Sequence, residues 1–145
     1  MKTRRKGTLG GIIIEGLPPA NSANVKGRRT WEWPLKKLML RSDHHVTAYY
    51  RKKGERFAEH FHKGDDPSKN PEYFLLLKGK IHINFQTKGG PKKEVSVDAD
   101  KGPVELTIQP LVLHSMRAIK DCWYLEYRPR KFNPLKPDIY APSEF

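Results

Sequence analysis

Four residues in the sequence carry side chains that are typical of a transition-metal site. His60 and His62 alternate within "RFAEHFH", Glu72 opens the apolar run "EYFLLLKG", and His114 follows "QPLV". Residues i and i+2 of a strand face the same side, so His60 and His62 point one way if this stretch is extended. Two imidazoles and a carboxylate on one face can bind a divalent transition metal while leaving other positions open. A third imidazole, from His114, would complete a four-ligand site.

The elements that must position these residues read as short strands separated by turns. "KIHINFQT" alternates strictly between apolar and polar residues, and "KGGPK" after it is a hairpin turn. The segment "KGDDPSKNP" between His62 and Glu72 has the composition of a loop. We expect strands within residues 45–53, 56–62, 72–79, 80–87, 93–99, 104–110, 113–119 and 122–130. This pattern predicts an all-β sandwich or barrel.

The length of 145 residues allows one domain with a core of its own. We expect residues 1–44 to form an N-terminal arm with short strands of the same domain, the clearest over Thr8–Glu15, with others at 29–33 and 35–40. Residues 45–130 would form the barrel core. Residues 131–145, which contain three prolines, would form a C-terminal extension of coil with at most one helical turn.

The composition indicates a basic, reduced, water-soluble protein. The formal charge of +12 fits either a solvated lysine-rich surface or attraction of small anions. No helix-turn-helix, zinc-finger or RNA-binding motif accompanies that charge, so the sequence gives no support for a nucleic-acid partner. No apolar run is long enough to span a membrane. The single cysteine, Cys122, excludes an internal disulfide, and we expect a cytoplasmic location.

The first histidine motif resembles that of the cupins, small β-barrels with a jelly-roll topology. The family motif reads Gly, five residues, His-x-His, three or four residues, Glu, six residues, Gly. Here Gly54 stands six positions before His60, and Gly79 stands seven after Glu72. The gap between His62 and Glu72 is nine residues instead of three or four. The extra residues fall in the predicted loop, where insertions are best tolerated, and we expect that loop to lie at the mouth of the site and shape ligand choice.

The second cupin motif is matched less completely. Pro110 and His114 keep the family's spacing, but Leu111 replaces the usual turn glycine and Ala118 stands where an Asn is common. The resemblance covers about residues 46–127 and implies a single-domain cupin jelly roll. It assigns the metal-ligand role to His60, His62, Glu72 and His114 and implies iron, manganese, nickel, zinc or cobalt, among which these ligands do not choose.

The fold hosts many chemistries, and the residues leave three classes of function open. The first is a metal-dependent enzyme, such as an oxygenase or isomerase, acting on a small oxygenated or acidic metabolite. Tyr50 and Tyr127 are its candidate catalytic residues, and Arg51 and Met116 are further candidates for contact with the substrate.

The second class is a sugar-nucleotide ketoisomerase or epimerase in which a histidine acts as base without a metal. "AEHFHK", residues 58–63, resembles a segment of those cupins, and a basic protein would suit a nucleoside diphosphate. Glu72 argues against it, since a metal-free isomerase has no need of a carboxylate at the ligand position. The third class is a non-catalytic cupin that binds a small ligand. By resemblance we also expect a homodimer, with the N-terminal strands available for the contact.

Overall fold

The structure is a computed structural model, and it describes residues 6–17, 45–67, 70–128 and 137–145. Secondary structure in these ranges is almost entirely strand. The strands are β1 (Lys6–Leu9), β2 (Ile12–Gly16), β3 (His45–Arg51), β4 (Arg56–His60), β5 (Glu72–Lys78), β6 (Lys80–Thr87), β7 (Lys93–Asp98), β8 (Val104–Ile108), β9 (Val112–Ala118) and β10 (Cys122–Arg128), and the 3-10 turn η3 spans Pro142–Glu144. The eight strands expected after residue 44 are all present.

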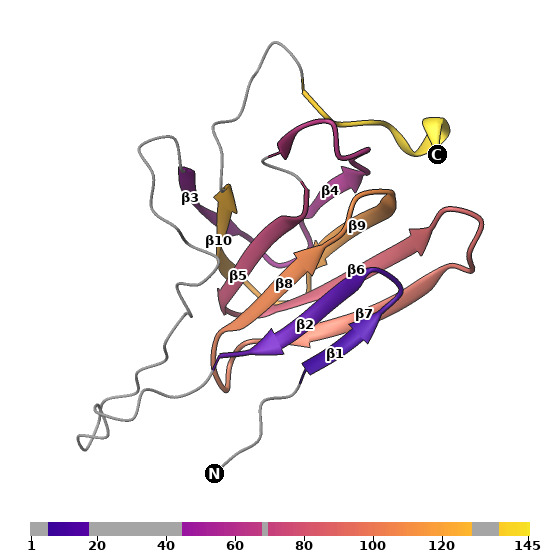
Figure 1. The fold of residues 1–145 in the computed structure, drawn as a ribbon. Coiled ribbons are helices and arrows are strands. Elements are labelled where there is room, and N and C mark those ends of the chain that lie inside the picture. The colour runs from indigo at the N-terminus through magenta and orange to yellow at the C-terminus, as the bar shows by residue number, and fades with distance from the viewer. Residues whose placement is uncertain (1–5, 18–44, 68–69, 129–136) are drawn as a thin grey trace, which may run out of the picture.

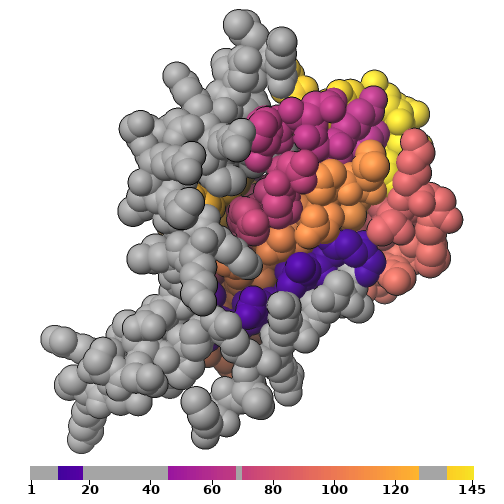
Figure 2. All heavy atoms as spheres, viewed as in Figure 1, coloured from indigo at the N-terminus to yellow at the C-terminus, as the bar shows by residue number. Residues whose placement is uncertain are grey.

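The strands form two antiparallel sheets. The larger has the order β1-β2-β8-β5-β10-β3, and the smaller has the order β4-β9-β6-β7 (Figure 1). Segments far apart in the chain therefore lie side by side. In Figure 2 the indigo N-terminal strands, the orange segment and the magenta segment form adjacent bands on one face, in agreement with the pairing of β2 with β8 and of β8 with β5.

The core lies between the two sheets and follows from the period of two along each strand. On β5, Phe74 and Leu76 point inward, and on β6, Ile81, Ile83 and Phe85 do so, all at most 5% exposed. Burying a side chain of this size contributes roughly 1.5–3 kcal/mol. These residues hold the sheets together, and the polar groups that share their inward face must therefore also lie inside the barrel.

The expected single strand over Thr8–Glu15 is wrong, because the segment folds back on itself. Gly10 and Gly11 have φ angles of 48° and 89°, and they form the two-residue turn between β1 and β2. Two consecutive positive φ angles suit a tight hairpin whose twist matches the sheet, and glycine adopts them readily. The other strands expected before residue 45 lie outside the described residues.

A bulge in β4 decides which way the first histidine points. Phe57 pairs with Met116 and His60 pairs with His114, so β4 contains one residue more than β9 over this interval. The irregularity includes Ala58, whose φ of 54° is uncommon for a residue with a Cβ. Because of the extra residue, Phe57 and His60 share the inner face although they are three positions apart.

Candidate functional site

The structure brings the four predicted ligand residues together inside the barrel. One potential ligand atom from each of His60, His62, Glu72 and His114 lies within 4.8 Å of the others. His62, Glu72 and His114 are 1–2% exposed, and His60 is half-buried. We refer to these four residues as the histidine cluster. Their role as metal ligands stays a prediction, but their convergence is a property of the fold.

The cluster is assembled from both sheets. Glu72 begins β5 and shares its inner face with Phe74, so it projects from the larger sheet. His60 and His114 are cross-strand partners on β4 and β9 of the smaller sheet, and His62 follows two residues after β4 ends. The centroid of the His60 imidazole lies 4.7 Å from that of His62 and 4.9 Å from that of His114. Three imidazoles and one carboxylate thus share a water-poor space.

Backbone carbonyls fix the protons of two of these imidazoles. Nδ1–H of His62 donates to the carbonyl of Asp138 at 2.5 Å, and Nδ1–H of His114 donates to the carbonyl of Val112 at 2.9 Å. A carbonyl oxygen has no proton to give, so Nδ1 must be the protonated nitrogen in each ring. In a neutral imidazole, Nε2 then presents a lone pair. This is the arrangement in which metal-binding histidines are commonly held.

His62 Nε2 also lies in close, buried contact with Oε2 of Glu72. With His62 neutral, this contact would set a lone pair against a carboxylate oxygen in a space that excludes water. The contact is favourable only if a proton or another cation lies between the two atoms. The donor set of three imidazoles and a carboxylate fits a divalent transition metal in that place.

Asp138 organises the loop that carries His62. Its carboxylate accepts the backbone N–H groups of Lys63 at 2.8 Å, Gly64 at 2.9 Å and Asp66 at 3.1 Å, and its side chain is 2% exposed. Burial raises the pKa of Asp138, but the three N–H donors outweigh this effect and leave the pKa below its usual range. The carboxylate is therefore held in its charged form.

Tyr140, in the same C-terminal segment as Asp138, packs against residues on both sides of His62. Tyr140 and Phe61 exchange backbone hydrogen bonds of 3.0 and 3.1 Å, and their rings stack. Lys63 Nζ lies 4.1 Å from the centroid of the Tyr140 ring. In Figure 1 the yellow C-terminal segment accordingly lies over the end of β4. The expectation of coil with one helical turn is confirmed for residues 137–145, but no role had been predicted for Asp138.

The turn between β8 and β9 supports the cluster from the other side. Leu111 N–H donates to the carbonyl of His62 at 2.7 Å. Leu111 has a φ of 60°, a conformation that the family's usual glycine would adopt without strain.

The two tyrosines proposed as catalytic residues do not join the cluster. Tyr127 pairs with Tyr73 on β5, and Tyr73 alternates with Glu72, so Tyr127 lies on the opposite face of the larger sheet from the cluster. Tyr50 packs on Trp123 and is 39% exposed. Alternation gave the two faces of these strands correctly but could not say which face was inside.

The other two candidates face the interior but are not members of the cluster. Arg51 Nε donates to the hydroxyl of Tyr124 at 3.3 Å and stacks over Phe57, while Met116 is 3% exposed within the core. Burial raises the pKa of Tyr124 to about 12, so its phenol stays protonated at neutral pH. Apolar residues that include Leu76 and Met116 enclose a void of only about 10 Å³ in this part of the barrel.

Glu126 is a second buried acid that the sequence analysis did not single out. It lies on β10 opposite Phe74 and is 6% exposed. Glu126 is two positions from Tyr124 on β10, so both side chains lie on the inner face. Its cross-strand partner Phe74 is two residues from Glu72 on β5. Two residues span about 7 Å along a strand. Alternation along "CWYLEYR" puts Cys122, Tyr124 and Glu126 in one phase, but the other phase, Trp123, Leu125 and Tyr127, is as apolar, so the sequence alone did not show that Glu126 faces inward.

Comparison with solved structures identifies the fold. QdtA, a sugar 3,4-ketoisomerase from Thermoanaerobacterium thermosaccharolyticum solved with TDP, is similar with a TM-score of 0.66 and 16% identity over 95% of this chain and 93% of that chain. A dTDP-4-dehydrorhamnose 3,5-epimerase from Sulfolobus tokodaii gives a TM-score of 0.61 with 15% identity over 91% of this chain and 78% of that chain. The fold is a cupin jelly roll.

A third cupin is the capsular polysaccharide assembling protein CapF from Staphylococcus aureus. It matches with a TM-score of 0.57 and 16% identity over 97% of this chain, and the chain spans only 32% of the CapF chain. No protein-family pattern and no curated protein matches the sequence. At these identities the likeness establishes the cupin fold, and the predicted jelly roll is confirmed. In the part of the chain that the structure describes, no helix is long and apolar enough to cross a membrane.

Proposed function

We propose that this cupin isomerises or epimerises a keto sugar carried on a nucleoside diphosphate, at the histidine cluster. The observation that carries the proposal is the burial of His60, His62, Glu72 and His114 around one point inside the barrel. The names of the similar cupins, a ketoisomerase with TDP and a dTDP-sugar epimerase, support this substrate class. The formal charge of +12 favours an anionic substrate.

The reaction class requires a group that removes a proton from the carbon beside a carbonyl and returns it to the same or a neighbouring position. Such a group must be near the substrate and titrate near the working pH, as histidine does, or be a carboxylate in a water-poor site. His60 is the most accessible member of the histidine cluster. It is the proton acceptor if the cluster acts without a metal.

The protonation of His62 and His114 at Nδ1 favours a metal-dependent version of the same reaction. Nδ1 of His62 and of His114 each donate to a carbonyl, so Nε2 of each can serve as a ligand, and Glu72 supplies an oxygen. When bound, a divalent ion would supply polarisation of the substrate carbonyl. The four cluster residues would then be occupied as ligands, and Glu126, buried on the inner face of β10, is the candidate proton acceptor.

The test combines metal analysis with proton exchange. The full chain is purified without chelator, and its metal content is measured. It is then incubated in D₂O with TDP-4-keto-6-deoxyglucose while the sugar protons are followed by NMR. We expect deuterium to enter beside the carbonyl. Loss of exchange on metal removal, with recovery on metal return, supports the metal-dependent version, and full exchange by metal-free protein supports His60 as base.

Glu72→Gln and Glu105→Gln form a matched pair for this test. Both glutamates are buried, at 2% and 4% exposure, on the paired strands β5 and β8, but they lie on opposite faces of the sheet. Exchange should fall at least a hundredfold in Glu72→Gln and persist in Glu105→Gln, with folding checked by circular dichroism. Absence of exchange by metal-loaded wild type with this sugar and with other keto-sugar nucleotides would reject the proposed function.

A further inference from the structure

The outer face of the smaller sheet carries a row of basic side chains. Arg117 on β9 is the direct cross-strand partner of Arg56 on β4 and of His82 on β6. All three residues therefore stand side by side on the face that points away from the barrel. Like charges directly opposite each other in a sheet are unfavourable, and neighbouring positions more often pair opposite charges. The row calls for an explanation beyond sheet stability.

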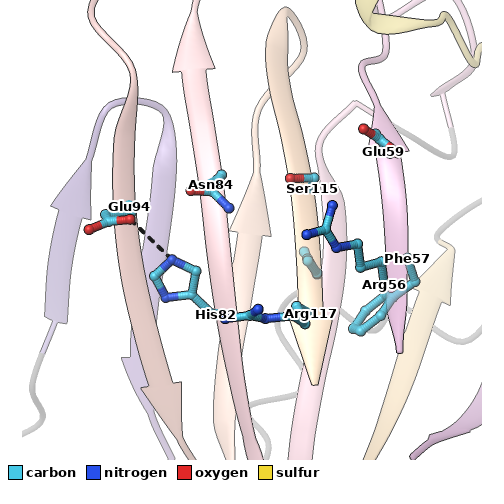
Figure 3. A pocket seen from close by; sticks show the side chains of 9 residues that line it. Arg56, Phe57, Glu59, His82, Asn84, Glu94, Ser115 and Arg117 are labelled. Carbon is cyan, nitrogen blue, oxygen red and sulfur yellow. Dashed lines mark hydrogen bonds and ion pairs between the residues drawn. The ribbon is translucent and has the colours of Figure 1, made fainter. Parts of the chain in front are cut away.

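A polar hollow of about 250 Å³ lies over this row. Figure 3 shows Arg56 reaching toward Ser115 on β9, with Arg117 beside His82 and with Asn84 on the neighbouring strand. Two guanidinium groups, a hydroxyl and an amide thus supply hydrogen-bond donors within one concavity. We call this site the arginine hollow. Within the described residues, neither arginine forms an ion pair with a carboxylate.

Two carboxylates flank the arginine hollow, and they narrow the choice of ligand. Glu94 on β7 accepts a hydrogen bond from Nε2–H of His82 at 3.2 Å, and Nδ1 of His82 shares a hydrogen bond with the Ser96 hydroxyl at 3.0 Å (Figure 3). Glu59 stands at the other side, on β4. A purely anionic ligand would meet repulsion from these acids. A ligand that adds hydroxyl groups to its anion could donate hydrogen bonds to them.

We propose that the arginine hollow binds a phosphorylated sugar, with the phosphate between Arg56 and Arg117 and the sugar hydroxyls toward the flanking carboxylates. The guanidinium group matches phosphate geometry through paired N–H donors. The volume is below the range of about 300–1,000 Å³ found for drug-sized ligands, so a compact monosaccharide phosphate fits better than a nucleotide. This site is separate from the histidine cluster, because the sheet itself lies between them.

The test is titration of the full chain with glucose 1-phosphate, inorganic phosphate and glucose at one fixed ionic strength, followed by amide NMR. We expect glucose 1-phosphate to shift the amides of Asn84 and Ser115 and to bind at least tenfold more tightly than the other two probes. Arg56→Gln and Arg117→Gln should each weaken this binding at least tenfold. Lys101→Gln, at an exposed lysine outside the hollow, controls for the loss of one positive charge.

A second variant tests the part assigned to the sugar. Glu59→Gln should weaken binding of glucose 1-phosphate while leaving or improving that of inorganic phosphate. Equal affinity for glucose 1-phosphate and inorganic phosphate would overturn the sugar assignment. Binding that is unchanged in both arginine variants, or amide shifts confined to barrel residues such as Phe74 and Leu76, would overturn the site itself.

Discussion

The histidine cluster and the arginine hollow share strands β4 and β9 and lie on opposite faces of that strand pair. On β9, His114 and Met116 face the barrel, while Ser115 and Arg117 face outward. His62 and His114 are held by backbone carbonyls and almost fully buried, whereas Arg56 and Arg117 are exposed to solvent. Electrostatic interactions are strong where water is excluded and weak where solvent and salt screen them. Changes inside should therefore have large, salt-independent effects, and changes outside should have small, salt-dependent ones.

The largest effect should come from Glu72→Ala. This change removes one partner of the buried His62–Glu72 pair and takes away a predicted metal ligand. Breaking a buried pair in this way costs about 3–5 kcal/mol. Urea unfolding at 50 mM and 500 mM NaCl measures the loss, which should be the same at both salt concentrations. A loss below 1 kcal/mol, or one that disappears in salt, would remove the distinction between the two faces.

Asp138→Ala should have the next largest effect. Its carboxylate accepts three backbone N–H groups, and hydrogen bonds to charged groups contribute roughly 1.5–3 kcal/mol each, without simple additivity. We expect a loss of about 2 kcal/mol or more and weaker metal binding, because the loop that carries His62 loses its support. The comparison variant Asp138→Asn keeps one acceptor oxygen and should lose less. Unaltered metal affinity in Asp138→Ala would show that the hydrogen bonds of the Asp138 carboxylate do not orient His62.

The lowered pKa of Asp138 also predicts acid sensitivity. A carboxylate with a lower pKa in the folded state than in the unfolded state stabilises the fold above the unfolded value of about 3.9. That contribution is lost as the pH falls through the folded pKa. The stability of the wild type should therefore decline below about pH 4 more steeply than that of Asp138→Asn. Parallel pH profiles from thermal melts would contradict this assignment.

Leu111→Gly should give a smaller effect of opposite sign. Leu111 has a φ of 60°, which costs a residue with a Cβ about 1–2 kcal/mol, and the greater freedom of glycine in the unfolded chain offsets part of the gain. We expect stabilisation by about 0.5–1 kcal/mol with unchanged metal content, since the backbone bond to His62 remains. Destabilisation would mean that the half-exposed leucine side chain contributes more than its backbone strain costs.

Arg117→Gln should produce the smallest effect and depend most on salt. Removing the central charge from the row of Arg56, Arg117 and His82 relieves repulsion. We expect stabilisation of roughly 0.2–0.5 kcal/mol at low salt, vanishing near 1 M NaCl, where the screening length is about 3 Å. Thermal melts in a phosphate-free buffer measure it. A destabilisation that persists in high salt would show that Arg117 acts by packing and not by charge.

The sequence predicted the strands from local alternation, and it predicted the histidine cluster from its resemblance to the two cupin motifs. Alternation along "KIHINFQT" gave β6, and the spacing of His60, His62, Glu72 and His114 gave a set that the fold brings together. The reversal at Gly10 was missed because the flanking residues read equally well as one strand. The barrel side of Tyr50 could not be predicted, since alternation separates two faces without labelling the inner one.

Asp138 could not have been found by local reasoning. Its partners, Lys63, Gly64 and Asp66, are more than 70 positions earlier, and nothing in its immediate surroundings marks it as buried. The arginine row was missed for a related reason. Arg56, Arg117 and His82 become neighbours only when the register of β4, β9 and β6 is known, and the bulge that includes Ala58 shifts that register.

The contact between His62 and Asp138 has a consequence for the synthesis of the protein. His62 and the Asp138 carbonyl that holds its proton are 76 positions apart. At about 5–20 residues per second, a ribosome needs roughly 4–15 s to pass from one to the other. The last cluster residue, His114, is added before Asp138, so all four cluster residues have been synthesised while His62 still lacks the carbonyl that fixes its tautomer. The site can therefore be completed only late in synthesis. A chain that stops before residue 138 would contain all ten strands but would lack the hydrogen bond from His62 Nδ1 to the carbonyl of Asp138.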